Sequence, residues 1–123
     1  MKEEMFLQVE FAKWLDGQGL LYCASMGGVR VSMVTAINMK KAGYKKGFPD
    51  IAILEPTDRC HGLFIELKVN AKTTSEQVLW QSELTKRGYM AVIMPKGLDF
   101  NSGIKWLQAC VSNYMRNYTD KHC

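Results

Sequence analysis

The sequence predicts a mixed α/β domain, in which a small sheet is covered by helices on both faces. Two apolar strand candidates, "DIAIL" (50–54) and "LFIELKV" (63–69), flank the turn-forming segment "EPTDRCHG". A helical segment (75–87) separates the second of these strands from a third apolar strand (89–95), and such a crossover favours parallel pairing. The length of 123 residues fits one domain, residues 1–123.

The first element is an amphipathic helix over residues 3–16. Four apolar side chains share one side at 100° per residue: Leu7, Phe11, Trp14 and Leu15. Glu4 and Gln8 project onto that same side, so Glu4 is an acid facing the expected core. Gly17 and Gly19 end the helix. "LLYCAS" (20–25) is a short strand candidate, and residues 33–42 form a second helix that Gly43 ends.

The remaining elements follow the strands 50–54 and 63–69. Thr74 stands three residues before Gln77, which is the spacing of a capping box at the start of the helix 75–87, and Gly88 ends this helix. The strand 89–95 stops at a proline. The last helix covers residues 103–117, with apolar side chains at helical spacing.

Composition and charge exclude several classes of protein. Hydrophobic residues make up 47% and charged residues 23% of the chain, and no apolar run approaches the roughly 20 residues of a membrane helix. The start, "MKEEMFLQVEF", is acidic and lacks the apolar core of a signal peptide, so we expect a cytoplasmic protein. Four cysteines are scattered without CxxC spacing and match no zinc pattern.

The positive charge is unevenly distributed. Between residues 27 and 49 the sequence has five basic residues and no acid: Arg30, Lys40, Lys41, Lys45 and Lys46. This segment can present a basic surface to phosphate, although a solvated helix face is the simpler interpretation of the charges alone.

Two carboxylates and an ammonium group interrupt the strongest strands. Because side chains alternate along a strand, Glu66 and Lys68 share one face of residues 63–69, and a neighbouring strand that begins at Asp50 can bring a second carboxylate close to Glu66. Adjacent carboxylates repel each other unless a cation intervenes. Mg²⁺ suits this position, because it binds one or two carboxylates together with water and phosphate. A backbone carbonyl of the strand, that of Leu67, can add a ligand.

The alternative is structural. "ELK" alone is better explained as a surface ion pair on a half-exposed strand, worth roughly 0–1 kcal/mol. Asp50, which follows Pro49 and precedes the hairpin, shifts the balance towards a metal site that hydrolyses phosphodiesters, with Lys68 beside the attacking water.

The segment "FPD…IELK" resembles the signature of the PD-(D/E)XK nucleases. More narrowly, the chain resembles a stand-alone VRR-NUC domain of the phage type. The matching pieces are Glu4 and Gln8, "GGVR", "MKKAGYKKGFPDI", "FIELKV" and "TSEQVLWQSELTKRGYMAVI". The resemblance covers residues 3–95. It implies a restriction-endonuclease-like αβββαβ core with a mixed central sheet.

The resemblance also implies roles for individual residues. Asp50 and Glu66 would be metal ligands, together with the Leu67 carbonyl, and Lys68 would be the catalytic lysine. Glu4 would reach the site from the first helix, through metal-bound water, with Glu10 as a fallback on the wrong side of that helix. Gln77 would face the site, unless it serves only the capping box. Gln8 would support Glu4, and Trp80 would pack in the core.

The function expected on this basis is that of a DNA endonuclease dependent on Mg²⁺ or Mn²⁺. Arg30, Lys45, Lys46 and Lys72 are the candidates for contacts with the DNA backbone. The chain resembles no base-reading module, so we expect selectivity for branched DNA by a homodimer, similar to a Holliday-junction resolvase, in phage-encoded DNA repair within a bacterial host. The last helix, with Trp106, Tyr114 and Tyr118, can either join the dimer interface or pack on the sheet. A flap, fork or restriction-like nuclease and a non-catalytic DNA-binding protein are the alternatives.

Overall fold

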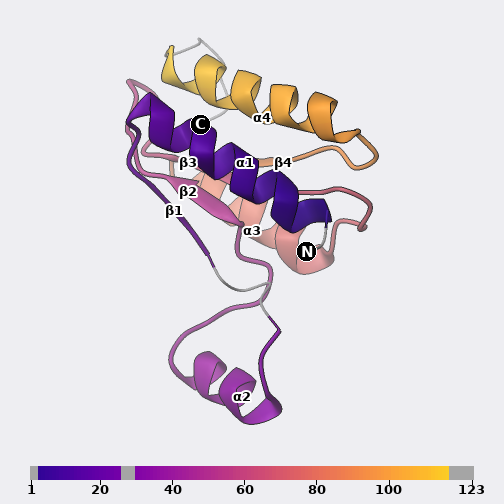
Figure 1. Ribbon diagram of the computed structural model, residues 1–123. Helices are drawn as coiled ribbons and strands as arrows, with labels where there is room; N and C mark the ends of the chain where they lie inside the picture. Colours follow the sequence, from indigo (N-terminus) through magenta and orange to yellow (C-terminus); the bar gives the residue numbers. More distant parts are fainter. Residues whose placement is uncertain (1–2, 26–29, 117–123) are drawn as a thin grey trace.

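All eight predicted helices and strands are present in the computed structural model, which describes residues 3–25 and 30–116 (Figure 1). In chain order the elements are α1 (Glu3–Gln18), β1 (Tyr22–Ala24), α2 (Met33–Lys41), β2 (Ile51–Ile53), β3 (Leu63–Glu66), α3 (Ser75–Lys86), β4 (Met90–Ile93) and α4 (Phe100–Met115). This order contains the expected αβββαβ core, with α2 inserted between β1 and β2.

The strands form one mixed sheet in the order β1-β2-β3-β4. β2 pairs with both β1 and β3 in the antiparallel sense, and Ile51 lies opposite Ile65. β3 and β4 are parallel, with Glu66 opposite Ile93, which confirms the pairing predicted from the crossover through α3.

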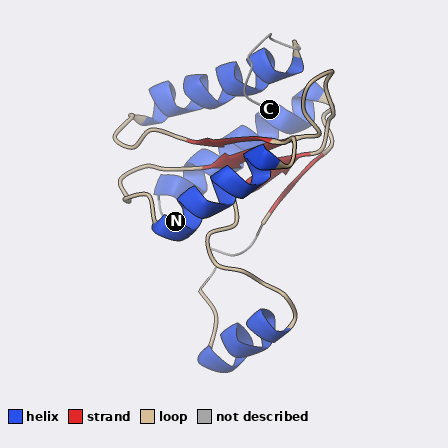
Figure 2. Cartoon of the chain, turned by 180° about the vertical axis from the view of Figure 1, so that it is seen from behind, coloured by secondary structure: helices blue, strands red, loops and turns tan. Residues whose placement is uncertain are grey.

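Helices cover both faces of the sheet, as the order of helices and strands predicts (Figures 1 and 2). On one face, α1 and α4 pack against the side chains of Ile51, Leu63 and Ile65, all of them buried. On the other face, Phe64 and Ala91 pack with Leu84 of α3. Glu66 stands two residues after Phe64 and therefore points towards the face that α3 covers.

Helix α2 stands apart from these layers in both views of the chain (Figures 1 and 2). None of its nine residues is buried. The two ends of the segment that carries α2 meet beside β2, where Ser25 donates hydrogen bonds from its N–H to the Asp50 carbonyl (2.8 Å) and from its hydroxyl to the Pro49 carbonyl (2.9 Å). The base of this segment is therefore fixed next to Asp50.

Some boundaries differ from those predicted. β3 ends at Glu66, so Lys68 follows the strand instead of lying within it. The last helix begins at Phe100 rather than 103, because the side chain of Asp99 caps it by accepting from the N–H of Ser102 (2.7 Å). Within the described ranges, no helix is both long enough and apolar enough to cross a membrane.

Helix α4 packs on the sheet, which is the simpler of its two expected roles. Tyr114 is buried, and its hydroxyl donates to the carbonyl of Glu55 (2.7 Å). Trp106 is partly buried against the same core. Tyr118 lies outside the described residues.

Candidate active site

Asp50 and Glu66 meet at one end of the β2–β3 pair. The register that sets Ile51 opposite Ile65 puts the next pair, Asp50 and Glu66, across from each other, although regular pairing stops one residue earlier. The backbone N–H of Leu67 donates to Asp50 Oδ2 (2.8 Å), which fixes that carboxyl group. Glu66 is buried, with 7% of its surface exposed.

Burial and mutual proximity raise the pKa of both carboxyl groups. Burial, then the charge of Asp50 and a hydrogen bond between the two side chains, raise the pKa of Glu66 from 4.5 to about 8. Burial also raises the pKa of Asp50, while hydrogen bonds from Leu67 and Glu66 oppose that change. The arrangement places a protonated Glu66 beside an Asp50 that accepts its hydrogen bond at neutral pH.

Lys68 lies at the same end of the sheet. Only 4% of its surface is exposed, and its ammonium group donates to the Lys72 carbonyl (3.1 Å). Its charge acts on the carboxyl groups of Glu4, Asp50 and Glu66, lowering the pKa of each. Within residues 3–25 and 30–116, no ion pair under 4.0 Å includes Lys68, so two of its three donors are available to other groups.

Gln77 joins the first turn of α3 to the carboxylates. Its Nε2 donates to Glu66 Oε2 (3.0 Å), while its Oε1 accepts from the N–H of Thr74 (3.0 Å) and its own N–H donates to Thr74 Oγ1 (3.2 Å). One amide therefore completes the capping box and contacts the site, so the two roles considered for Gln77 are compatible.

Glu4 approaches from α1. Burial and then the charge of Asp50 raise the pKa of Glu4, whereas Lys68 and a hydrogen bond from the Val69 backbone lower it. Glu10 lies elsewhere: it is exposed and pairs with Lys13 at 3.1 Å. The structure therefore brings Glu4 towards the site and leaves Glu10 in solvent. Gln8 is half-buried on α1.

Gly47 is a positioning residue that sequence reasoning missed. Its φ is +90°, and a Cβ there would lie 2.6 Å from the Cβ of Glu76 and 3.0 Å from the backbone nitrogen of Gln77. The chain that leads to Asp50 therefore passes directly against the first turn of α3. A glycine two residues before the "PD" pair was the available signal.

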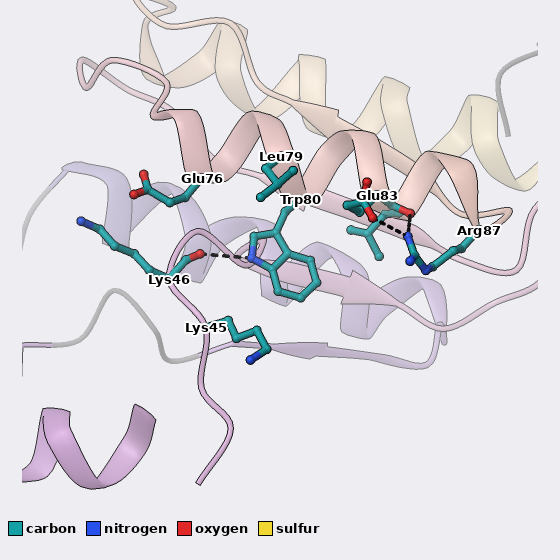
Figure 3. A pocket seen from close by; sticks show the side chains of 8 residues that line it. Lys45, Lys46, Glu76, Leu79, Trp80, Glu83 and Arg87 are labelled. Atoms are coloured by element: carbon teal, nitrogen blue, oxygen red, sulfur yellow. Dashed lines mark hydrogen bonds and ion pairs between the residues drawn. The ribbon is translucent and has the colours of Figure 1, made fainter. Parts of the chain in front are cut away.

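The four basic residues expected at the DNA backbone are exposed and lie on different segments. Arg30 precedes α2, Lys45 and Lys46 follow it, and Lys72 lies between β3 and α3. "GGVR" falls partly outside the described residues. The backbone of Lys46 is fixed, because its carbonyl accepts from Trp80 Nε1 (3.1 Å; Figure 3).

Trp80 packs as expected. Its ring meets Phe48 edge to face with centroids 4.9 Å apart, and Phe48 meets Phe64 of β3 in the same way at 5.8 Å. This aromatic contact, together with the bond to Lys46, attaches the segment leading to Asp50 to α3.

The donor set at Asp50 and Glu66 fits a hard divalent cation. In the part of the chain that the structure describes, no three His, Cys, Asp or Glu side chains converge on one point that would hold a metal ion. The site thus provides two carboxylates and adjacent backbone oxygens, which is the protein share that Mg²⁺ takes when water and phosphate complete its coordination. A cation there would also lower the raised pKa of both carboxyl groups.

A search of solved structures supplies an independent comparison. The chain is similar to a protein described as "VRR_NUC domain protein", with a TM-score of 0.69 and 26% sequence identity over 91% of this chain and 90% of the other. No family model matches the sequence, and no curated protein matches it. The fold is thus restriction-endonuclease-like, and the similarity, which extends over nine-tenths of both chains, supports a VRR-NUC domain.

Proposed function

We propose that the chain is a nuclease that hydrolyses DNA phosphodiester bonds with Mg²⁺ or Mn²⁺ held by Asp50, Glu66 and the Leu67 carbonyl. The observation that carries the proposal is the meeting of the buried carboxyl group of Glu66, the half-buried carboxyl group of Asp50 and the buried ammonium group of Lys68 at one end of the sheet. The similarity to a VRR_NUC domain protein supports the nuclease class.

The residues of the chain have distinct tasks in this proposal. Asp50 is held by the N–H of Leu67, and Glu66 is held by Gln77, so both carboxylates keep a fixed direction. A bound metal ion supplies Lewis-acid stabilisation of phosphate charge and makes water a better nucleophile. Lys68 donates to the attacking water or to the phosphate oxygens, since two of its protons are not used by the Lys72 carbonyl. Glu4 orients water at the edge of the site.

The finer proposal is selectivity for branched DNA by a homodimer. Two sites related by a twofold axis would suit a substrate with two equivalent strands. Arg30, Lys45, Lys46 and Lys72 would bind backbone phosphates, which steer DNA to the metal without reading sequence.

The test is a cleavage panel on four-way, flap and linear duplex DNA of matched sequence, with and without Mg²⁺. The wild-type protein should cut in a metal-dependent way and prefer the four-way substrate, whereas Lys68→Met should bind DNA without cutting it. Lys96→Met, which removes a lysine from an exposed position, is the matched control and should cut normally. Preference for flap or linear DNA would refute junction selectivity, and metal-independent cutting or no cutting would refute the metal nuclease.

A further inference from the structure

Two cavities beside α3 join to form one groove. The first, of about 450 Å³, lies along α3 from Glu76 to Arg87, which Figure 3 shows at its opposite ends with Trp80 between them. The second, of about 370 Å³, continues past Tyr44. Lys45 and Trp80 line both cavities, so the two are adjacent. We call the two cavities together the α3 groove.

The α3 groove begins beside the candidate active site. Glu76 precedes Gln77, whose amide donates to Glu66 (3.0 Å). Ser25, which lines the second cavity, donates its N–H to the Asp50 carbonyl (2.8 Å). From Glu76 the groove follows α3 to its C-terminal end, about 16 Å away at 1.5 Å per residue. A DNA strand with a phosphate at the carboxylates can therefore continue into the groove.

Aromatic and aliphatic side chains line the α3 groove. The ring of Trp80 is half-buried and held in one orientation, because its Nε1 donates to the Lys46 carbonyl (3.1 Å) and Phe48 packs edge to face with it (4.9 Å between centroids). Leu79, next to it in the groove, is 60% exposed. An aromatic ring that is already ordered stacks on a nucleobase with little further loss of side-chain entropy, and such stacking accepts any base.

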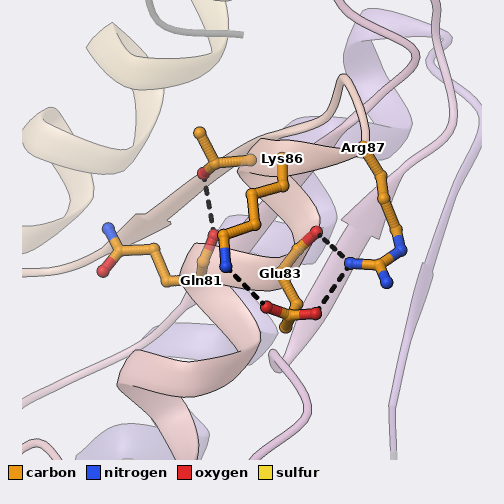
Figure 4. Close-up of polar contacts among 5 residues, drawn as sticks. Gln81, Glu83, Lys86 and Arg87 are labelled. Atoms are coloured by element: carbon orange, nitrogen blue, oxygen red, sulfur yellow. Dashed lines mark hydrogen bonds and ion pairs between the residues drawn. The ribbon is translucent and has the colours of Figure 1, made fainter.

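Basic residues outnumber acids around the α3 groove. The basic residues are Lys45, Lys46, Lys86 and Arg87, and the acids are Glu76 and Glu83. Glu83 is already paired with Lys86 at 3.1 Å and with Arg87 at 2.9 Å (Figure 4). Lys45 and Lys46 are exposed, and among the described residues neither has an ion pair under 4.0 Å. The groove therefore attracts phosphate groups.

Another cavity beside the active site does not suit DNA. It measures about 240 Å³, lies between the beginnings of α1 and α4, and includes Val69, which follows Lys68. Glu3 and Asp99 line it, and none of the described basic residues does, so it would repel phosphate. Electrostatics therefore favours the α3 groove as the surface for DNA.

The α3 groove fits unpaired nucleotides better than a duplex. Bases in a duplex are stacked on one another, so a protein reaches only their edges and the backbone. The aromatic and aliphatic lining of the groove would gain little contact from such a surface. Each cavity has a volume in the range of about 300–1,000 Å³ that is typical of small-molecule sites, which suits a single nucleotide.

We propose that the α3 groove binds unpaired nucleotides of the DNA strand that passes through the active site, with one base stacked on Trp80 and phosphates at Lys45 and Lys46. Moving a base into the groove costs least where the base has no partner, as at a branch point, which gives a physical cause for selectivity for branched DNA. The inference rests on the proposed function for its choice of ligand, but its test measures binding with a chelator present and needs no cleavage.

The first test measures the binding of a labelled oligothymidylate of about eight nucleotides by fluorescence anisotropy, with a chelator present. The wild-type protein should bind it more tightly than an abasic oligomer of the same length, which carries the same phosphates but no bases. Leu79→Glu should weaken the binding at least about fivefold, the effect of one unit charge about 4 Å from a phosphate in water. Val78→Glu adds the same charge at a neighbouring position that is 51% exposed and lines neither cavity, so it should leave the affinity nearly unchanged.

The second test locates the base by tryptophan fluorescence. Oligothymidylate should quench the emission of the wild-type protein. Trp80→Phe keeps an aromatic ring, so it should still bind the oligomer, but most of the quenching should disappear with the indole. Trp14 and Trp106 are internal controls, because they belong to α1 and α4 on the other face of the sheet.

Three results would each overturn the proposal: equal affinity for the abasic oligomer, an unchanged affinity in Leu79→Glu, or full quenching in Trp80→Phe. A protein that cuts branched DNA but does not bind oligothymidylate would also overturn it and would leave the nuclease assignment intact. A protein that binds oligothymidylate as expected but cuts no DNA with Mg²⁺ would support the groove and refute the nuclease.

Discussion

Replacing Glu66 with glutamine should remove much of the pH dependence of folding in the metal-free protein. The pKa of Glu66 is raised from 4.5 to about 8 by burial and by Asp50. The folded protein therefore keeps a proton that the unfolded chain has lost between these two values. Stability from this group is complete below about pH 4.5, and it falls as the pH rises towards 8. Glutamine preserves the shape and the acceptor for Gln77 but does not titrate.

The size of the effect follows from linkage. One proton contributes about 1.4 kcal/mol for each pH unit between the unfolded and folded pKa values. The full interval sets an upper limit of roughly 5 kcal/mol, and solvent entry and relaxation around the carboxyl group reduce it to roughly 2–3 kcal/mol. A difference of this size exceeds the precision of denaturant unfolding.

The assay is unfolding in urea with a chelator present, monitored by tryptophan fluorescence at pH values from about 5.5 to about 8.5. The free energy of unfolding of the wild-type protein should fall over this range, whereas that of Glu66→Gln should fall much less. Glu10→Gln removes an exposed carboxylate and should behave as the wild type does. Equal slopes for the wild type and Glu66→Gln would refute the electrostatic description of the site.

Three further changes separate positioning, binding and chemistry. Gly47→Ala should destabilise the fold and reduce cleavage, because the added Cβ would collide with Glu76. Gly19→Ala is the control: Gly19 also has a positive φ (+68°) but open space around it, so the free energy of unfolding should fall by only about 1–2 kcal/mol. Lys45→Ala with Lys46→Ala should reduce the slope of log affinity against log salt by up to about 1.8 in DNA titrations, and an unchanged slope removes both from the interface. Lys68→Met should lower the single-turnover cleavage rate by at least about 100-fold with DNA affinity nearly unchanged; normal cleavage would end its catalytic assignment.

The sequence predicted which side chains come together at the candidate site, because simple periodicities set their positions. Alternation along the strand placed Glu66 on the face opposite Leu67, and the order of the two strands brought Asp50 close to Glu66. The helical projection placed Glu4, and not Glu10, on the side of α1 that faces the core. The capping-box spacing located Gln77 at the start of α3, although periodicity alone did not indicate that its amide would also reach Glu66.

Such periodic patterns could not predict the features that depend on tertiary contacts. Met33, Val34 and Ile37 have the spacing of a buried helix face, yet they are exposed in the single chain, because burial depends on what stands opposite and not on the pattern. The role of Gly47 depends on how closely Glu76 approaches it, and these residues are far apart in the sequence. β3 ends at Glu66, before the predicted boundary, because strand pairing stops where the N–H of Leu67 donates to the Asp50 side chain.

The most direct test of the central claim is a calorimetric titration of the protein with Mn²⁺. The wild-type chain should bind one ion with a heat that disappears in Asp50→Asn and Glu66→Gln, while Lys68→Met should still bind it. Binding of Mn²⁺ by Asp50→Asn with wild-type affinity, in a folded protein, would contradict the assignment of this carboxyl pair as the metal site.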